Sequence, residues 1–381
     1  MAEKVAIVGW GQSKFEREMK DIHLGELIYE TVRKTLADTG LEIGDIDTVI
    51  NASCDVMDGR SISNVFTVEA MGAFLKEESK VEEDAAYAAL YAYMRLLAGP
   101  FQTAMVVGHA KVSESSPQTY TGMICDPFLL RPLGIEAITS SALQARSYMS
   151  RYGITEEQAA KVVVKNRKNG ARNTNAQIRK PVSVADVMAS PVLASPIKKY
   201  DASPITDGCA VMIMATAKKA KKITDTPVWI KGVGYDHDLY YPGYRDLSKS
   251  ESCALAAKRA YKMAKIKDPL NEIDCAEVYE PFSFYELMLY ESLRLCGKGE
   301  GGKLIDDGAT EPDGKLPVNL SGGALCANPI LATGLVRMME AAMQLSGKAG
   351  EHQLKNKPKK AIAHSTSGLC LQSNIVYVLS V

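Results

Sequence analysis

Short apolar runs alternate with amphipathic segments over the first fifty residues. The run VAIVG (residues 5–9) is rich in β-branched side chains and closes on glycine, a pattern typical of a buried strand. Residues 24–39 then place five leucine, isoleucine and valine side chains on one helical face, and Gly40 follows as a suitable C-cap. Residues 46–53 (IDTVINAS) again have the pattern of a strand. This order predicts a βαβ unit and a parallel sheet covered by helices.

The same pattern recurs near the end of the chain. Residues 255–278 resemble residues 30–50: each stretch has an amphipathic helix, a break, an Ile-Asp pair and a strand, and a strand containing glycines precedes each. We interpret this as an internal duplication with halves at 1–118 and 226–381.

The segment between the halves, residues 119–225, has a different texture. Within it, residues 155–170 begin with Thr155 and have Gln158 three positions on, as in a capping box. Residues 189–208 are punctuated by proline and serine and predict a loop. We expect this middle segment to cover a ligand site built by the two halves.

Composition limits the classes of function. The 381 residues are 46% hydrophobic and 24% charged, enough for a large core, and the formal net charge is zero. No basic surplus indicates nucleic acid or an anionic membrane surface, although a few local lysines and arginines could bind a polyanionic ligand. The eight cysteines show no zinc-like spacing, and no apolar run reaches 18 residues. Strand-like sequence begins by Val5, so we expect no signal peptide. We therefore expect a cytoplasmic protein with free thiols, no membrane span and no metal site.

Five stretches of the sequence are similar to motifs of a known family and occur in the same order. They are YMSRYGITEEQAAKVVVKNRKNGARNTNAQ (148–177), SPIKKYDASPITDGCAVMIMA (195–215), EVYEPFSFYEL (277–287), NLSGGALCANPILATG (319–334) and AIAHSTSGLC (361–370). Together they resemble the thiolase superfamily, and within it the sterol-carrier-protein-type thiolases and their archaeal and bacterial acetyl-CoA acetyltransferase relatives.

The resemblance implies an α/β thiolase-like fold, in which two duplicated βαβ halves form a layered αβαβα core with an inserted loop domain. It also implies Claisen-type chemistry on acyl-CoA, with the CoA thioester as substrate and no separate cofactor. In the family a cysteine at a helix N-terminus takes the acyl group, a histidine activates it, and an oxyanion hole holds each thioester oxygen. A helix N-terminus lowers the pKa of a thiol and stabilises developing negative charge.

The nucleophile of the family is missing from the corresponding stretch, residues 79–99. One pairing puts its position at Ala85 and another near Glu82, and neither is cysteine. Glu82, Glu83 and Asp84 stand at the start of the predicted helix, either as caps that match the helix dipole or as catalytic carboxylates.

The other active loops depart as well. Asn328 replaces the histidine of the family's Gly-His-Pro, and an amide can donate to an oxyanion but cannot act as a base near pH 7. Tyr279 takes the place of a histidine or asparagine and could also donate, with Glu280 as an orienting carboxylate. We expect Gly322 and Gly323 to let two loops approach the thioester closely. Each of these polar residues could equally satisfy loop backbone or pack structurally.

His364 stands in the stretch resembling the family's His-Asn-x-Gly-Gly, which makes it the best remaining acid/base candidate, against a structural role at a strand end. Cys370 and Cys326 lie on active-loop segments, and His109 follows a strand and could face the site, although an inert buried role is open for each. Candidates for CoA phosphate contacts, otherwise surface charges, are Lys165, Arg167, Lys168, Arg172, Arg245 and Lys249.

Three functions remain open from the sequence. The chain could be a catalytic acyltransferase that uses Tyr279, Asn328 and His364 without a cysteine. It could be the thiolase-like subunit of a hetero-oligomer, working with a cysteine-bearing thiolase or with a small zinc-ribbon/OB-fold subunit. It could also be a CoA-thioester-binding scaffold without an enzymatic role. In each case we expect a homodimer at least, because sheets of this kind pair through edge strands.

Overall fold

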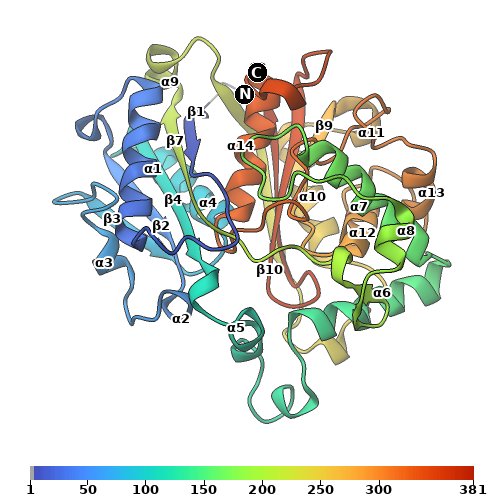
Figure 1. Ribbon diagram of the computed structural model, residues 1–381. Coiled ribbons are helices and arrows are strands. Elements are labelled where there is room, and N and C mark those ends of the chain that lie inside the picture. The colour runs from blue at the N-terminus through green and yellow to red at the C-terminus, as the bar shows by residue number, and fades with distance from the viewer. Residues whose placement is uncertain (1–3) are drawn as a thin grey trace.

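A computed structural model describes residues 4–381. Nine strands form one sheet in the order β3-β2-β4-β7-β1-β8-β11-β10-β9 (Figure 1). The first half contributes β1 (Val5–Gln12), α1 (Leu24–Thr39), β2 (Thr48–Ala52), α2 (Asp55–Asp58), α3 (Asn64–Thr67), β3 (Glu77–Val81), α4 (Ala85–Ala98), β4 (Thr103–Lys111), β7 (Asp207–Thr216) and α9 (Ala217–Ile223). The second contributes β8 (Val228–His237), α10 (Glu251–Ala264), α11 (Pro269–Glu272), β9 (Cys275–Glu277), α12 (Ser283–Ser292), α13 (Gly301–Asp306), α14 (Thr333–Ser346), β10 (Lys360–Ser367) and β11 (Ser373–Ser380).

Strand pairing confirms the duplication. In the first half β2 pairs parallel with β3 and β4, β4 pairs antiparallel with β7, and β7 pairs antiparallel with β1. In the second half β9 pairs parallel with β10, β10 antiparallel with β11, and β11 antiparallel with β8. A single parallel bridge between Ala276 and Val318 stands where β3 stands in the first half. The antiparallel pair of β1 and β8 joins the two halves.

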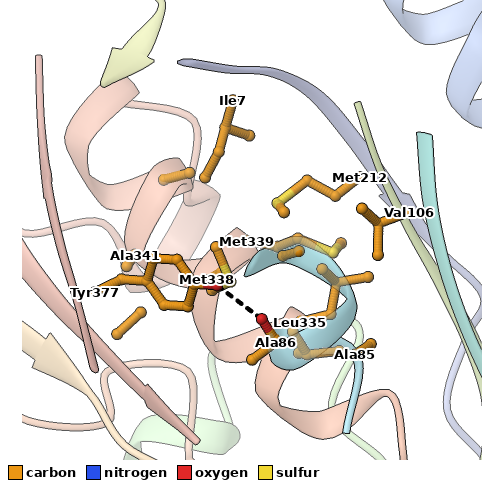
Figure 2. Close-up of a cluster of buried hydrophobic side chains, with 14 of the residues drawn as sticks. Ile7, Ala85, Ala86, Val106, Met212, Leu335, Met338, Met339, Ala341 and Tyr377 are labelled. Carbon is orange, nitrogen blue, oxygen red and sulfur yellow. Dashed lines mark hydrogen bonds between the residues drawn. The ribbon is translucent and has the colours of Figure 1, made fainter. Parts of the chain in front are cut away.

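Helices complete five layers, as expected for an αβαβα core. The helices α4 and α14 contact each other and the sheet of both halves, α1 covers the outer face of the first half, and α10 covers that of the second. Figure 2 shows the central layer, where side chains from both helices meet those of the strands and the hydroxyl of Tyr377 donates to the carbonyl of Ala86 over 2.7 Å. This bond ties β11 of the second half to the first turn of α4.

Local sequence accounts for the helix ends. Gly40 adopts a left-handed conformation, with φ of 68°, and closes α1. The capping box of Thr155 and Gln158 begins α7, as the sequence predicts. Asp84 is the N-cap of α4 and accepts a hydrogen bond from the backbone N–H of Ala86.

The middle segment packs mainly on the second half. Its elements are α5 (Pro117–Met123), α6 (Ala137–Tyr152), α7 (Glu156–Gly170), α8 (Val184–Met188), β5 (Val192–Ala194) and β6 (Ile197–Lys198). The helices α6 and α7 contact α12, and Figure 1 shows this green segment in front of the second half, with α5 at the lower edge of the molecule. The strand β7 falls within the range 119–225 but pairs in the sheet of the first half. The domain boundaries expected from the sequence stay a prediction. Within residues 4–381, no helix is both long enough and apolar enough to cross a membrane.

Candidate active site

A cavity of about 690 Å³ lies where the middle segment meets the loops of both halves. Its wall includes Asp84 at the start of α4, Tyr279 and Asn328 from the second half, Cys370 after β10, and Arg167 from α7. Tyrosine, asparagine and aspartate side chains from three loops therefore share one enclosed space.

Tyr279 is held by the loop that follows β9. Its backbone N–H donates to Nδ1 of His364 over 3.4 Å, and its hydroxyl lies within hydrogen-bonding reach of the side chains of Thr333 and Asn328. Burial, and then the negative charge of Asp84, raise the pKa of the Tyr279 phenol well above its ordinary value. The phenol therefore stays protonated and can act as a hydrogen-bond donor in the cavity.

Asn328 is fixed on both sides of its amide. The carbonyl oxygen Oδ1 accepts from Thr333 Oγ1 over 2.8 Å, and Nδ2 donates to Ser203 Oγ over 2.9 Å. Its backbone N–H donates to Thr206 Oγ1 over 2.9 Å. Nδ2 carries a second hydrogen, which lies within reach of the Tyr279 hydroxyl, so Asn328 can donate to an oxyanion that takes the place of this contact.

Asp84 is a buried carboxylate at a helix N-terminus. Oδ1 accepts from the Ala86 N–H over 2.9 Å and from Ser365 Oγ over 2.8 Å, while Oδ2 accepts from the Gly334 N–H over 2.9 Å. Burial raises the pKa of Asp84 to about 6, with Glu83 adding to the rise and the three donors opposing it. Oδ2 has capacity for one more bond, so Asp84 can take a proton from a ligand in the cavity.

Ala85, the position paired with the family's nucleophile, is fully buried and does not line the cavity. Its backbone N–H donates to the carbonyl of Leu331 over 2.6 Å. Figure 2 shows its side chain in the packed core with Leu335 and Val106. The first-turn residue that faces the cavity is Asp84.

His364 does not occupy the position expected of an acid/base. Its Nδ1 accepts from the Tyr279 N–H, and its Nε2 lies 2.9 Å from Oδ1 of Asn374, so both nitrogens are used. Burial lowers the pKa of His364 to about 4, and the residue does not line the cavity. This geometry gives His364 a role in positioning Tyr279 and does not support proton transfer.

The double glycine, which the sequence predicts to approach a thioester, lies in the interior of this structure. A Cβ on Gly322 would lie 2.7 Å from Cα of Gly170, and one on Gly323 would lie 2.0 Å from Oε1 of Glu280. Neither glycine lines the cavity. Glu280 is likewise buried away from it: Oε1 accepts from Asn166 Nδ2 over 3.0 Å, and burial together with the charge of Glu286 raises the pKa of Glu280 to about 8. The two glycines therefore allow close packing in the interior, while Asn328 further along the same stretch lines the cavity.

Of the three remaining candidate residues, one lines the cavity and two are buried away from it. Cys326 is buried outside the cavity wall, with Sγ 3.3 Å from the carbonyl of Asn166 and its pKa raised to about 12 by burial. His109 is also buried outside the wall, with Nδ1 3.8 Å from Oδ1 of Asp58. Cys370 does line the cavity; burial raises the pKa of its thiol to about 11, and Sγ lies 3.3 Å from the carbonyl of Ser140.

Two residues of the cavity wall, Asp84 and Arg167, could not be singled out from the sequence. In the sequence Asp84 stands beside two other acids, and helix capping explains all three equally well. The sequence pattern does not show that Asp84 is the one that faces the cavity. Arg167 stood among six basic candidates, but Lys165 in the same group is fully buried and pairs with Glu286 over 2.5 Å. In the motif Lys-Asn-Arg, the first two side chains therefore point into the core and that of Arg167 faces the cavity.

Comparison with known proteins agrees with this architecture. Residues 236–381 match the family model described as thiolase C-terminal domain-like. The chain is 32% identical over 358 residues to an acetyl-CoA acetyltransferase of Methanothermobacter thermautotrophicus, covering 92% of this chain and 93% of that protein. It is 29% identical over 235 residues to the benzoylsuccinyl-CoA thiolase subunit BbsB of Thauera aromatica, covering 61% of this chain and 60% of that protein. The solved Ltp2-ChsH2(DUF35) aldolase superposes with a TM-score of 0.85 at 22% identity, over 99% of this chain and 97% of that one. The chain belongs to the thiolase superfamily, in the branch that contains acetyl-CoA acetyltransferases and sterol-carrier-protein-type thiolases.

Proposed function

We propose that this chain makes or breaks a carbon–carbon bond next to the thioester carbonyl of an acyl-CoA, without an acyl-cysteine intermediate. The observation that carries the proposal is the shared cavity of Asp84, Tyr279 and Asn328, in which the start of α4 presents a carboxylate where the family has a thiol. Membership of a family that contains acetyl-CoA acetyltransferases supports a CoA thioester as the substrate.

The groups in the cavity suit a direct reaction between two thioesters. The carboxylate of Asp84 takes a proton from the α-carbon of one acyl group, and the resulting enolate oxygen accepts hydrogen bonds from the Tyr279 hydroxyl and from the second Nδ2 hydrogen of Asn328. The α-carbon then forms a bond to the carbonyl carbon of the second thioester. When that carbonyl reforms, CoA leaves as a thiolate and recovers the proton from Asp84. The reverse sequence breaks the same bond.

The cavity itself favours this chemistry. Asp84 and Tyr279 are 3% and 7% exposed, so water competes little for their hydrogen bonds. Holding both acyl groups in one enclosed space replaces an encounter of two reactants in solution with an oriented complex.

We propose in addition that the chain acts as one subunit of a complex. The names of two similar proteins, a thiolase subunit and a DUF35-containing aldolase, support an assembly of this kind. An apolar surface beside the cavity offers a place for a partner: Phe128, Leu133 and Tyr244 are 84%, 73% and 77% exposed. The Tyr240 hydroxyl donates to the carbonyl of Ile124 over 2.7 Å, which ties the two segments of this surface together, and Ile124 also lines the cavity. The candidate partners are a zinc-ribbon/OB-fold subunit and a cysteine-bearing thiolase, and a homodimer is expected within the complex.

Substitution of the cavity residues tests the proposed chemistry. Condensation and cleavage of short acyl-CoA thioesters are measured with the chain alone and with a co-expressed zinc-ribbon/OB-fold subunit. Asp84→Asn removes the base and should lower the rate by about 10²- to 10⁴-fold. Tyr279→Phe removes one oxyanion donor and should lower it by about 10²-fold or more. Glu82→Gln is the matched control, since Glu82 is an exposed acid two residues from Asp84.

The outcomes separate the alternatives. Equal rates for Asp84→Asn and Glu82→Gln would exclude Asp84 as the base. CoA binding without turnover under every condition would favour a CoA-thioester-binding scaffold, which the absence of a thiol from the start of α4 also allows. Failure to bind any CoA thioester at millimolar concentration would overturn the proposed substrate class.

A further inference from the structure

One cation lies inside the cavity without a partner. Arg167 is 7% exposed and lines the cavity wall, and its Nε is fully buried without a hydrogen bond. Among residues 4–381 no carboxylate lies within ion-pair distance of its guanidinium, and its nearest aromatic contact is the Tyr200 ring, with Cζ 5.9 Å from the ring centroid.

Neighbouring charges on the same helix are satisfied, which makes Arg167 unusual. Lys165 pairs with Glu286 over 2.5 Å, and Asn166 donates to Glu280 and Glu286 over 3.0 and 2.7 Å. Lys168 is on the surface, with Nζ 3.9 Å from Glu311. Of the three cations in this run, only Arg167 is buried without an ion-pair partner among the described residues.

A buried guanidinium without a counter-charge is unfavourable, because the loss of hydration is not offset by an ion pair. A ligand that brings negative charge into the cavity would remove this imbalance. The guanidinium is planar and offers parallel N–H groups, which match the two oxygens of a carboxylate better than they match a neutral acyl chain.

The position of Arg167 separates this negative charge from the phosphates of CoA. Arg17 and Lys199 also line the cavity, but both are exposed, and in the described part of the chain neither has an ion-pair partner. The phosphates of CoA can meet these two exposed cations, which leaves the buried Arg167 for a negative charge on another part of the ligand.

We infer that Arg167 binds a carboxylate carried by the acyl group, so that the preferred substrate is a dicarboxylic acyl-CoA with a free acid at the end distant from the thioester. The inference rests on the proposed function and specifies the substrate class of the same site.

Paired ligands of equal chain length test it by titration calorimetry. Succinyl-CoA, glutaryl-CoA and adipyl-CoA are compared with butyryl-CoA, valeryl-CoA and hexanoyl-CoA on the wild-type chain and on Arg167→Met. Lys161→Met is the control, since Lys161 is a cation of the same helix that does not line the cavity. At least one dicarboxylic ligand should bind more tightly than its neutral counterpart. For that ligand Arg167→Met should lose at least about 30-fold in affinity, since it leaves a carboxylate without its cation. The affinity of Arg167→Met for the neutral ligands, and that of Lys161→Met for every ligand, should stay within about threefold of wild type.

A second variant guards against misfolding. Arg167→Lys retains the charge and should retain part of the preference, while thermal unfolding and circular dichroism show whether each variant is folded. An equal loss for dicarboxylic and neutral ligands in Arg167→Met would mean that Arg167 contacts the CoA moiety, and would overturn the inference. If the wild-type chain bound both ligands of every pair equally well, the inference about Arg167 would be overturned and the proposed function would stand. If it bound no ligand of any pair, the proposed function would be overturned as well.

Discussion

Asp84 should make the stability of the protein depend on pH in a direction opposite to that of an ordinary carboxyl. Burial raises its pKa from 3.8 to about 6, so folding favours the protonated form. A group of this kind contributes stability below its unfolded pKa of 3.8, and that contribution is lost as the pH rises through its folded pKa near 6. A shift of about two units corresponds to about 3 kcal/mol in total, of which about half falls between pH 5 and 7.5.

The variant Asp84→Asn isolates this contribution. An asparagine can still accept at the helix N-terminus, but its amide group would face the Gly334 N–H, so it carries a constant cost at every pH. The pH-dependent part should vanish, because asparagine does not titrate. Other groups around the site, including Glu83 and Tyr279, remain in both proteins and cancel in the difference to a first approximation.

Urea unfolding of both proteins at several pH values between 5 and 7.5 measures the effect. The free energy of unfolding of the wild type should fall relative to that of Asp84→Asn by about 1.4 kcal/mol as the pH rises over this range. Glu82→Gln, an exposed neighbour, should show no comparable slope. A constant difference between wild type and Asp84→Asn, or a slope of the opposite sign, would refute the assignment of Asp84 as a buried carboxyl with a raised pKa.

Three further predictions concern packing, assembly and covalent chemistry. Gly323→Ala should destabilise the fold by more than about 1 kcal/mol, because φ is 64° and the new Cβ would meet Glu280 at 2.0 Å, whereas Gly44→Ala meets nothing within 4 Å and serves as the control in thermal unfolding. Light scattering should give about twice the chain mass of 41.3 kDa, since β3 lies at one edge of the sheet and can pair with a second copy; a monodisperse monomer at micromolar concentration would exclude this. Intact-protein mass spectrometry after incubation with acyl-CoA should show no hydroxylamine-labile adduct on residues 79–99, which contain no cysteine. An adduct on Cys370, the thiol in the cavity wall, would instead establish acyl-enzyme chemistry.

The architecture was predictable because its signals are local and repeated. The apolar face of α1 and the Ile-Asp pair before β2 return in the second half, where Lys265 takes the left-handed position that Gly40 has after α1. Both copies form the same strand pairings. Tyr279 and Asn328 could be selected for a different reason: each replaces a residue type at a recognisable point of a loop. Both line the cavity, and their catalytic roles stay a prediction.

The direction of individual side chains was not predictable in the same way. His364 and Glu280 lie next to wall residues along the chain or through a hydrogen bond, yet both face the interior, and that choice depends on partners such as Asn374 and Asn166 from distant elements. Arg167 and Lys165 are two positions apart on one helix and differ in the same respect. Whether such a side chain faces the cavity or the interior depends on tertiary packing, so it cannot be predicted from the sequence of one loop.

The contacts of Asp84 also limit the evolutionary routes open to this site. Its carboxylate accepts from backbone N–H groups at the beginnings of both α4 and α14, so one side chain joins the two duplicated halves. Reintroducing a thiol by Ala85→Cys would place sulfur in a filled core, where a Cβ on the adjacent Gly108 would already come within 2.8 Å of Ala85, and would place any thiolate beside a negative charge. Removing Asp84 first would leave the Gly334 N–H and the Ser365 hydroxyl without their acceptor. Cysteine chemistry at this position would therefore require several coordinated substitutions.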